Sequence, residues 1–167
     1  MDSLEYEVRL GVRHGKTFNP SIGQREHDLL VNILKEHTSF VHNLHEYTDT
    51  YFTDSLRHNS YTNRTEVKTK IHQNDQIFGK YTIRCCTSKE EPIQKNCTNM
   101  VAKHVRQKRR HRFSTERFHI DLTHIQNIGS YELEIEATKR FSRKYSSEFI
   151  KNVLISELKN LVASTNL

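Results

Sequence analysis

The chain has 167 residues, of which 34% are hydrophobic and 28% are charged, with no tryptophan. We therefore expect one domain spanning residues 1–167 with a modest core, because a second core would leave each half short of buried surface. Lys and Arg outnumber Asp and Glu by 26 to 20. This balance favours a polyanionic partner, such as RNA, DNA, a nucleotide or an acidic membrane surface, over a basic protein with no such partner. No apolar run reaches transmembrane length, so we expect no membrane-spanning helix.

The predicted elements begin with a strand over residues 4–12. Ser21 and Gln24 have the spacing of an N-terminal capping box, and apolar residues then recur at helical spacing, so a helix is expected over residues 22–44. Alternating β-branched and aromatic residues predict seven further strands, at 47–53, 55–62, 65–71, 80–88, 108–114, 117–124 and 130–139. Short connections between several of them favour antiparallel neighbours.

Two other segments complete the chain. Residues 91–107 form a long, basic connection that could include a short helix. Ser146 or Ser147 can cap a last helix, whose apolar stripe runs from Phe149 to Val162.

Carboxylates alternate with apolar residues on the first and the last predicted strands. Glu5 and Glu7 share one face of the first strand with Arg9, and three glutamates share one face of the last, namely Glu132, Glu134 and Glu136. Glutamates at this spacing lie roughly 7 Å apart along one face, so they repel one another unless solvent or a cation separates them. A divalent cation with a preference for oxygen ligands, Mg²⁺ or Mn²⁺, suits such rows. The alternative is that each row is the solvated outer face of an ordinary sheet.

Cations follow the same alternation on the middle strands. The positions are Arg57, Lys68, Lys70, Arg84, Lys108, Arg110 and Arg112, and Glu90 and Asp121 add carboxylates on neighbouring strands. Nearly every strand thus has one apolar face and one charged face. Either an open sheet with a wet outer face or a barrel with a charged interior and helices outside would satisfy this pattern. The barrel would join a metal site to a cationic wall, which is a binding site for polyphosphate.

These segments resemble the triphosphate tunnel metalloenzymes, and among them the RNA triphosphatases of fungal and viral mRNA capping. LEYEVRLG and YELEIEA are similar to the two glutamate motifs of the family. Four segments between them, in the family's order, resemble its phosphate-binding and acidic strands: DSLRHNSYTNRTEVKTKI, IRCCTSKEEP, KRRHRFS and FHIDLTHI. The chain departs from the family at Arg110, where lysine is frequent.

The resemblance implies a mainly β (α+β) fold, an eight-stranded antiparallel closed β-barrel with flanking helices. It implies one Mg²⁺ or Mn²⁺ held by Glu5, Glu7, Glu134 and Glu136 with Glu132 in support. The phosphate-binding side chains would be Arg57, Lys68, Arg84, Lys108, Arg110 and Arg112. Glu90 would orient or deprotonate the attacking water, and Asp121 would position a basic side chain or reach the metal through water.

The implied activity is hydrolysis of the γ-phosphate from the 5′-triphosphate end of nascent mRNA. Substrates would be 5′-triphosphate RNA and nucleoside triphosphates, with a capping guanylyltransferase as a possible partner. One alternative is a tunnel hydrolase of free nucleoside triphosphate, inorganic tripolyphosphate or thiamine triphosphate. Another is a β-sheet module that binds RNA without catalysis and stacks bases on its aromatic residues, namely Tyr47, Tyr51, Phe52, Tyr61 and Phe113.

Three cysteines, Cys85, Cys86 and Cys97, form no C-x-x-C pair. Their odd number and spacing favour a reducing, intracellular compartment, without distinguishing nucleus, cytoplasm or viral factory.

Overall fold

The computed structural model describes residues 4–94 and 96–167, and within them nine strands and three helices. The strands are β1 (Leu4–His14), β2 (Thr17–Asn19), β3 (Val41–Tyr51), β4 (Leu56–Asn59), β5 (Arg64–Phe78), β6 (Tyr81–Ile93), β7 (His104–Ser114), β8 (Phe118–Ile125) and β9 (Ser130–Ala137). The helices are α1 (Gln24–Glu36), α2 (Lys139–Ser142) and α3 (Ser147–Thr165). None of the helices in the described ranges is both long and apolar enough to cross a bilayer.

Eight of the strands form a closed antiparallel barrel. They follow one another in the order β1-β6-β5-β4-β3-β7-β8-β9, and β9 pairs with β1 to close the ring, while β2 adds to the end of β1. Every pairing is antiparallel. The predicted closed barrel with flanking helices is confirmed, with β2 as one additional strand.

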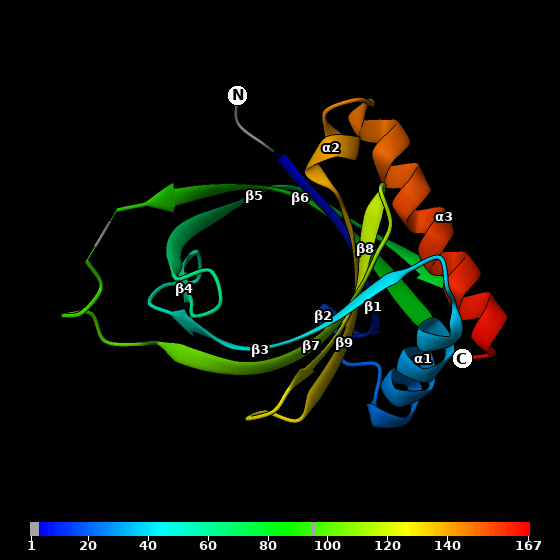
Figure 1. The fold of residues 1–167 in the computed structure, drawn as a ribbon, viewed down its shortest axis with the longest axis horizontal. Helices are drawn as coiled ribbons and strands as arrows, with labels where there is room; N and C mark the ends of the chain where they lie inside the picture. Colours follow the sequence, from blue (N-terminus) through cyan, green and yellow to red (C-terminus); the bar gives the residue numbers. More distant parts are fainter. Residues whose placement is uncertain (1–3, 95) are drawn as a thin grey trace.

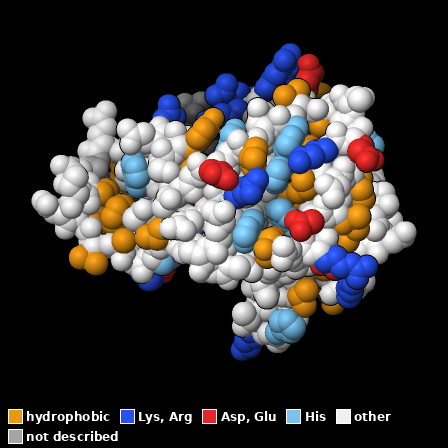
Figure 2. Space-filling view, turned by 60° about the horizontal axis from the view of Figure 1, so that its bottom comes forward, with side chains coloured by type: hydrophobic (Ala, Val, Ile, Leu, Met, Phe, Trp, Pro, Cys, Tyr) orange, Lys and Arg blue, Asp and Glu red, His pale blue; other side chains and the backbone are white. Residues whose placement is uncertain are grey.

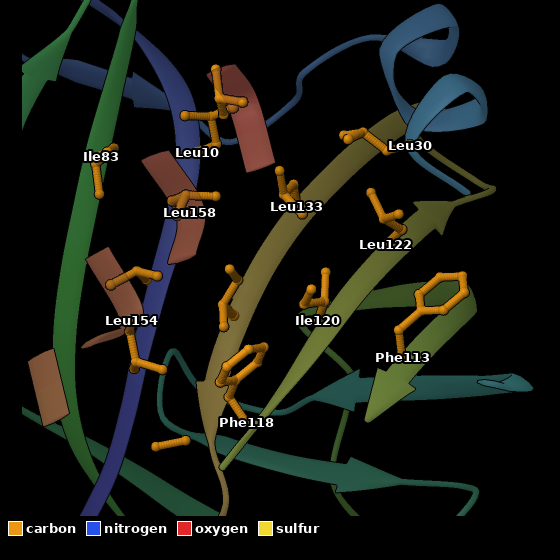
Figure 3. Close-up of a cluster of buried hydrophobic side chains, with 14 of the residues drawn as sticks. Leu10, Leu30, Ile83, Phe113, Phe118, Ile120, Leu122, Leu133, Leu154 and Leu158 are labelled. Carbon is orange, nitrogen blue, oxygen red and sulfur yellow. The ribbon is translucent and has the colours of Figure 1, made fainter. Parts of the chain in front are cut away.

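The hydrophobic core lies between the outer face of the barrel and the helices. In Figure 1 all three helices lie along the same side of the barrel, where α3 packs on β1, β6 and β9 and α1 packs on β8 and β9. Leu10, Leu133 and Leu154 are fully buried there, and Figure 3 shows the strand and helix side chains converging in this layer. Because the apolar face of each strand is used outside, the charged face points into the barrel.

The first helix is shorter than predicted. It ends at Glu36, and Val41–Tyr51 is strand β3, which pairs with β7 along its whole length. Val41 and Leu44 are exposed, so their helical spacing did not indicate the buried face of a helix. The predicted extension to residue 44 is wrong because strand β7 pairs with residues 41–44 and provides backbone partners that a helix would have satisfied internally.

The predicted capping box is also wrong. Gly23 is the N-cap of α1, with φ of 95°, a conformation that glycine adopts without strain, and no side chain caps this helix. Ser21 instead accepts a hydrogen bond from the Tyr131 amide at 3.2 Å and ties the segment to β9. The predicted start of the last helix is confirmed, because the Ser146 hydroxyl accepts from the Phe149 amide at 3.3 Å.

Strand β5 continues seven residues beyond its predicted end at residue 71. A bulge between Lys70 and His72 leaves Ile71 exposed and shifts the alternation by one residue. Asp75, which the sequence pattern did not single out, thereby faces Arg84 across the β5–β6 pair. The helix expected within residues 91–107 does not occur in the described part of that segment. Its first residues belong to β6, which ends at Ile93, and its last residues belong to β7, which begins at His104. Lys95, in the connection between them, lies outside the described residues.

Candidate active site in the barrel

The two acidic rows lie side by side at the seam that closes the barrel. Strands β1 and β9 are hydrogen-bonded neighbours, with Glu7 opposite Glu136 and Arg9 opposite Glu134. The Arg9 guanidinium lies 2.7 Å from a Glu134 carboxylate oxygen and 3.2 Å from Glu7. Residues from opposite ends of the chain thus form one charged surface inside the barrel.

Three carboxylates form a compact cluster on β8 and β9. Asp121, Glu134 and Glu136 each offer an oxygen within 4.8 Å of the other two. Asp121 is only 1% exposed. Burial, and then the charges of Glu5 and Glu134, raise the pKa of the Glu136 carboxyl to about 8. The charged form of Glu136 is therefore disfavoured where it lies, and a bound cation would stabilise it.

The donor set of this cluster fits Mg²⁺ or Mn²⁺. All its ligand atoms are carboxylate oxygens, which are hard donors, and no cysteine or histidine belongs to the cluster. Glu132 shares the inward row of β9 and is 9% exposed, but it lies outside the three-residue cluster.

Lys68 holds the two glutamates of β1. Its ammonium nitrogen lies 2.6 Å from Glu5, 3.2 Å from Glu7 and 3.7 Å from Glu90. Burial alone would lower the pKa of Lys68, but Glu7 and Glu5 together raise it well above its ordinary value. Burial also raises the pKa of Glu5, an effect that Lys68 partly offsets. Lys68 therefore supplies the positive charge between these carboxylates.

Arginines of β7 lie next to the acidic cluster, because β7 pairs with β8 and β8 pairs with β9. Arg112 donates two hydrogen bonds to Asp121, at 2.8 and 2.7 Å, and one to Glu136 at 3.3 Å. Arg110 lies 3.3 Å from Asp121 and donates to Thr123 at 3.0 Å. Burial opposes the charge of Arg110, but Asp121 and its acidic neighbours Glu134 and Glu136, together with Tyr47, outweigh it and raise the Arg110 pKa. Both arginines are thus fixed beside the acidic cluster.

Two more predicted cations depend on a carboxylate that the sequence pattern did not single out. Asp49 of β3 is 1% exposed and lies 2.7 Å from Lys108 and 4.0 Å from Arg57. Burial tends to raise the Asp49 pKa, but Lys108 lowers it overall. Arg57 also donates to Glu90 at 2.9 Å. Asp49 lies within the strand predicted at residues 47–53, on the same face as Tyr47 and Tyr51, but this single carboxylate was not singled out because no second acidic residue shares that face of the predicted strand.

Arg84 lies apart from the acidic cluster. Asp75 accepts two hydrogen bonds from it, both at 2.9 Å, and these bonds raise the Arg84 pKa. The Arg84 guanidinium also lies over the Phe18 ring, 4.1 Å from the ring centroid. Neither partner was predicted, because β2 was missed and the bulge in β5 was not foreseen.

Among the described residues, two cavities of opposite charge are lined by interior side chains. The larger, about 510 Å³ and here called the basic mouth, is lined by two carboxylates, Glu7 and Asp54, and by the cations Arg9, Arg57, Lys68, Lys70, Arg84 and Arg106. The smaller, about 170 Å³ and here called the acidic mouth, is lined by two cations, Arg64 and Lys139, and by Glu5, Glu66, Glu90 and Glu136. Along β1, Glu5 faces the acidic mouth and Arg9 the basic mouth, roughly 13 Å further on.

The structure therefore brings the predicted side chains into one interior. Ion pairs join Glu5, Glu7 and Glu90 to Lys68, and Asp121 and Glu136 to Arg112. Arg84 lines the basic mouth, and Glu132 lies beside the cluster on the same face of β9. The catalytic and metal-binding roles of these residues stay predictions.

No protein-family model matches this sequence, and no curated protein sequence matches it. Solved structures do resemble it. The Pct1 RNA triphosphatase of S. pombe, solved in complex with the Spt5 CTD, has a TM-score of 0.70 and 17% identity, covering 99% of this chain and 84% of that chain. The Mimivirus capping enzyme triphosphatase has a TM-score of 0.61 and 16% identity, covering 100% and 91%.

A conserved hypothetical protein from Pyrococcus furiosus also resembles the chain, with a TM-score of 0.51 and 13% identity over 95% of this chain and 90% of that chain. At these identities the likeness is one of fold. The chain has the tunnel fold that those RNA triphosphatases have, and the fold implied by the sequence resemblance is confirmed.

Proposed function

We propose that this protein is a metal-dependent RNA 5′-triphosphatase that removes the γ-phosphate from the 5′-triphosphate end of nascent mRNA. The observation that carries the proposal is the position of the Asp121–Glu134–Glu136 cluster beside Arg110 and Arg112 inside a closed barrel. A carboxylate cluster and fixed cations side by side suit a polyphosphate with a divalent ion, because phosphoryl transfer depends on charge stabilisation. The tunnel fold of the S. pombe and Mimivirus triphosphatases supports it.

Asp121, Glu134 and Glu136 would hold Mg²⁺ or Mn²⁺, with Glu5 and Glu7 across the seam. Asp121 thus takes a more direct part than the one expected from the sequence, because its oxygen belongs to the cluster itself. The metal would neutralise charge on the γ-phosphate. The surrounding residues of the chain would bind the phosphate oxygens and orient the attacking water.

The cations would bind the phosphate oxygens. Arg110 and Arg112 are held in place by Asp121, and Arg57 by Glu90, so little side-chain freedom is lost when phosphate binds. Lys68 can exchange its contacts with Glu5 and Glu7 for a phosphate oxygen, which would free both glutamates. Glu90, at the side of the acidic mouth, is the proposed group that orients the attacking water.

The products would be phosphate and RNA with a 5′-diphosphate end. A capping guanylyltransferase, which consumes such an end, is the proposed partner. An intracellular location also remains a proposal.

The test is phosphate release from γ-labelled triphosphate RNA with Mg²⁺ or Mn²⁺. Glu134→Gln and Arg112→Gln should each lower kcat by about a hundredfold or more, because each removes charge next to the reacting phosphate. Glu46→Gln is the matched control, since Glu46 pairs with the exposed Arg109 away from both cavities. Wild-type rates in Glu134→Gln would exclude the assigned metal site.

A further inference from the structure

The two mouths of the barrel differ in charge, and this difference gives the substrate a direction. The basic mouth is lined by six cationic side chains and two carboxylates, and the acidic mouth by four carboxylates and two cationic side chains. A polyanion is attracted to the first and repelled by the second. A triphosphate end would therefore enter with its γ-phosphate leading from the basic mouth, and the nucleoside attached to it would remain there.

The basic mouth contains an aromatic ring placed by β2. Phe18 lies against Gly11, where an added Cβ would come within 2.5 Å of the Phe18 ring and 2.4 Å of the Asn19 carbonyl oxygen. Only glycine at this position leaves room for β2 to bring the Phe18 ring against β1. Arg84, fixed by Asp75, lies over the same ring. Phe18 is therefore held in the lining of the cavity.

A second ring lines the same cavity from β3. Tyr51 is the last residue of that strand and is half-buried, with its ring stacked on His104 at a centroid distance of 4.4 Å and an interplanar angle of 14°. The Arg106 guanidinium lies 5.6 Å from the Tyr51 ring centroid. Phe18, Tyr51 and Arg106 all line the basic mouth. None of them has a part in the phosphate chemistry proposed above.

We propose that Phe18, Tyr51 and Arg106 bind the first nucleoside of a substrate whose triphosphate lies deeper in the barrel. This inference rests on the proposed function for its substrate and adds the base-binding residues. Aromatic rings and arginine guanidinium planes stack on any base, so the site would accept a nucleoside whatever its base. Inorganic tripolyphosphate has no base and gains nothing from these residues. The chain then prefers polyphosphate that carries a nucleoside.

Equilibrium binding tests this proposal without requiring hydrolysis. Adenosine 5′-(β,γ-imido)triphosphate and inorganic imidodiphosphate, each with Mn²⁺, are titrated into the full chain by calorimetry. Tyr51→Ala should weaken the imido nucleotide about tenfold, the loss expected for one stacking ring, and leave imidodiphosphate within about twofold. Tyr51→Phe keeps the ring and should bind both ligands as the wild type does.

Phe18→Leu provides a second variant that keeps an apolar side chain against Gly11, and it should show the same selective loss. Tyr61→Ala is the control, because Tyr61 is exposed and stacks on His45 outside the basic mouth. Equal weakening of both ligands, no weakening of either, or no binding of the imido nucleotide to the wild type would overturn the proposal. A failure of the proposed function would show itself separately, as absent phosphate release from RNA by a protein that still binds the nucleotide selectively.

Discussion

Buried ion pairs set the energetics at the scale of single residues. Lys108 and Asp49 form the most enclosed of them, at 2.7 Å, with side chains 7% and 1% exposed. A buried ion pair stabilises the folded state little more than two packed apolar side chains would, because both ions lose their hydration. One buried ion without its partner, however, strongly destabilises the fold. Asp49 also bonds Asn59 and lies near Arg57, so its loss would affect several neighbours at once.

Asp49→Ala should lower the free energy of unfolding by about 3–5 kcal/mol, because Lys108 would remain buried without a counter-charge. Urea denaturation monitored by circular dichroism measures the change. Asp54→Ala is the matched control. Asp54 pairs with Lys103 at the surface, where its side chain is 88% exposed, so its loss should change the free energy of unfolding far less than the loss of Asp49 does. Similar costs for the two variants would contradict the account of the interior pair.

At the scale of secondary-structure elements, a histidine pair joins β3 and β7 on the outside of the barrel. His42 and His111 share a hydrogen bond of 2.9 Å between ring nitrogens, and His42 stacks on Phe113. Figure 2 shows histidine side chains gathered on one face of the molecule, among hydrophobic and charged ones. Burial, followed by the charges of His42 and Lys35, lowers the pKa of His111 to about 4.

This pair should make the protein less stable in mild acid. The unfolded chain protonates a histidine near its ordinary pKa of about 6.5, whereas the folded chain leaves His111 neutral until about pH 4. Between these values the unfolded state binds more protons, so acidification lowers the free energy of unfolding. His111→Gln should show a smaller decrease between pH 7 and pH 5 in urea titrations than the wild type.

The comparison between wild type and variant removes carboxylate effects that both share, including the opposite contribution of Glu136, whose pKa is raised by burial and by Glu5. His14→Gln, at the exposed end of β1, serves as the control. An unchanged pH dependence in His111→Gln would show that the pair does not couple stability to pH.

At the scale of the whole molecule, barrel closure brings the site together. Glu136 and Asp121 come from neighbouring strands β9 and β8, while Glu5 and Glu7 reach them only because β1 pairs with β9. A cation bound at this seam would therefore oppose its opening and stabilise the folded state by mass action.

Mn²⁺ at about one hundred times its dissociation constant should stabilise the wild type by about 2.7 kcal/mol, provided that it binds only the folded chain. Thermal unfolding should show this as a rise of several degrees in Tm. The double variant Glu134→Gln/Glu136→Gln should lose the rise, and Glu46→Gln should keep it. An equal rise in the double variant would place the ion elsewhere.

Much of the fold and the site could be predicted because the relevant pattern is local. Alternation at period two separates an apolar from a charged face on each strand, whatever the strand's neighbours, and the glutamates of β1 and β9 and the arginines of β7 could be read from it. The start of α3 at Ser146 is equally local, because a cap bonds an amide three residues away.

Tertiary structure decided everything that depends on partners distant in sequence. Strand β3 replaced the end of the predicted helix because β7 hydrogen-bonds to it there, and the bulge at Ile71 turned Asp75 toward Arg84. Phe18 lines the basic mouth only because β2 folds onto Gly11. The residue pattern by itself thus determined which side chains are charged on which face. Closure of the sheet decided which of those faces meet, because register and enclosure are properties of paired strands and not of any one segment.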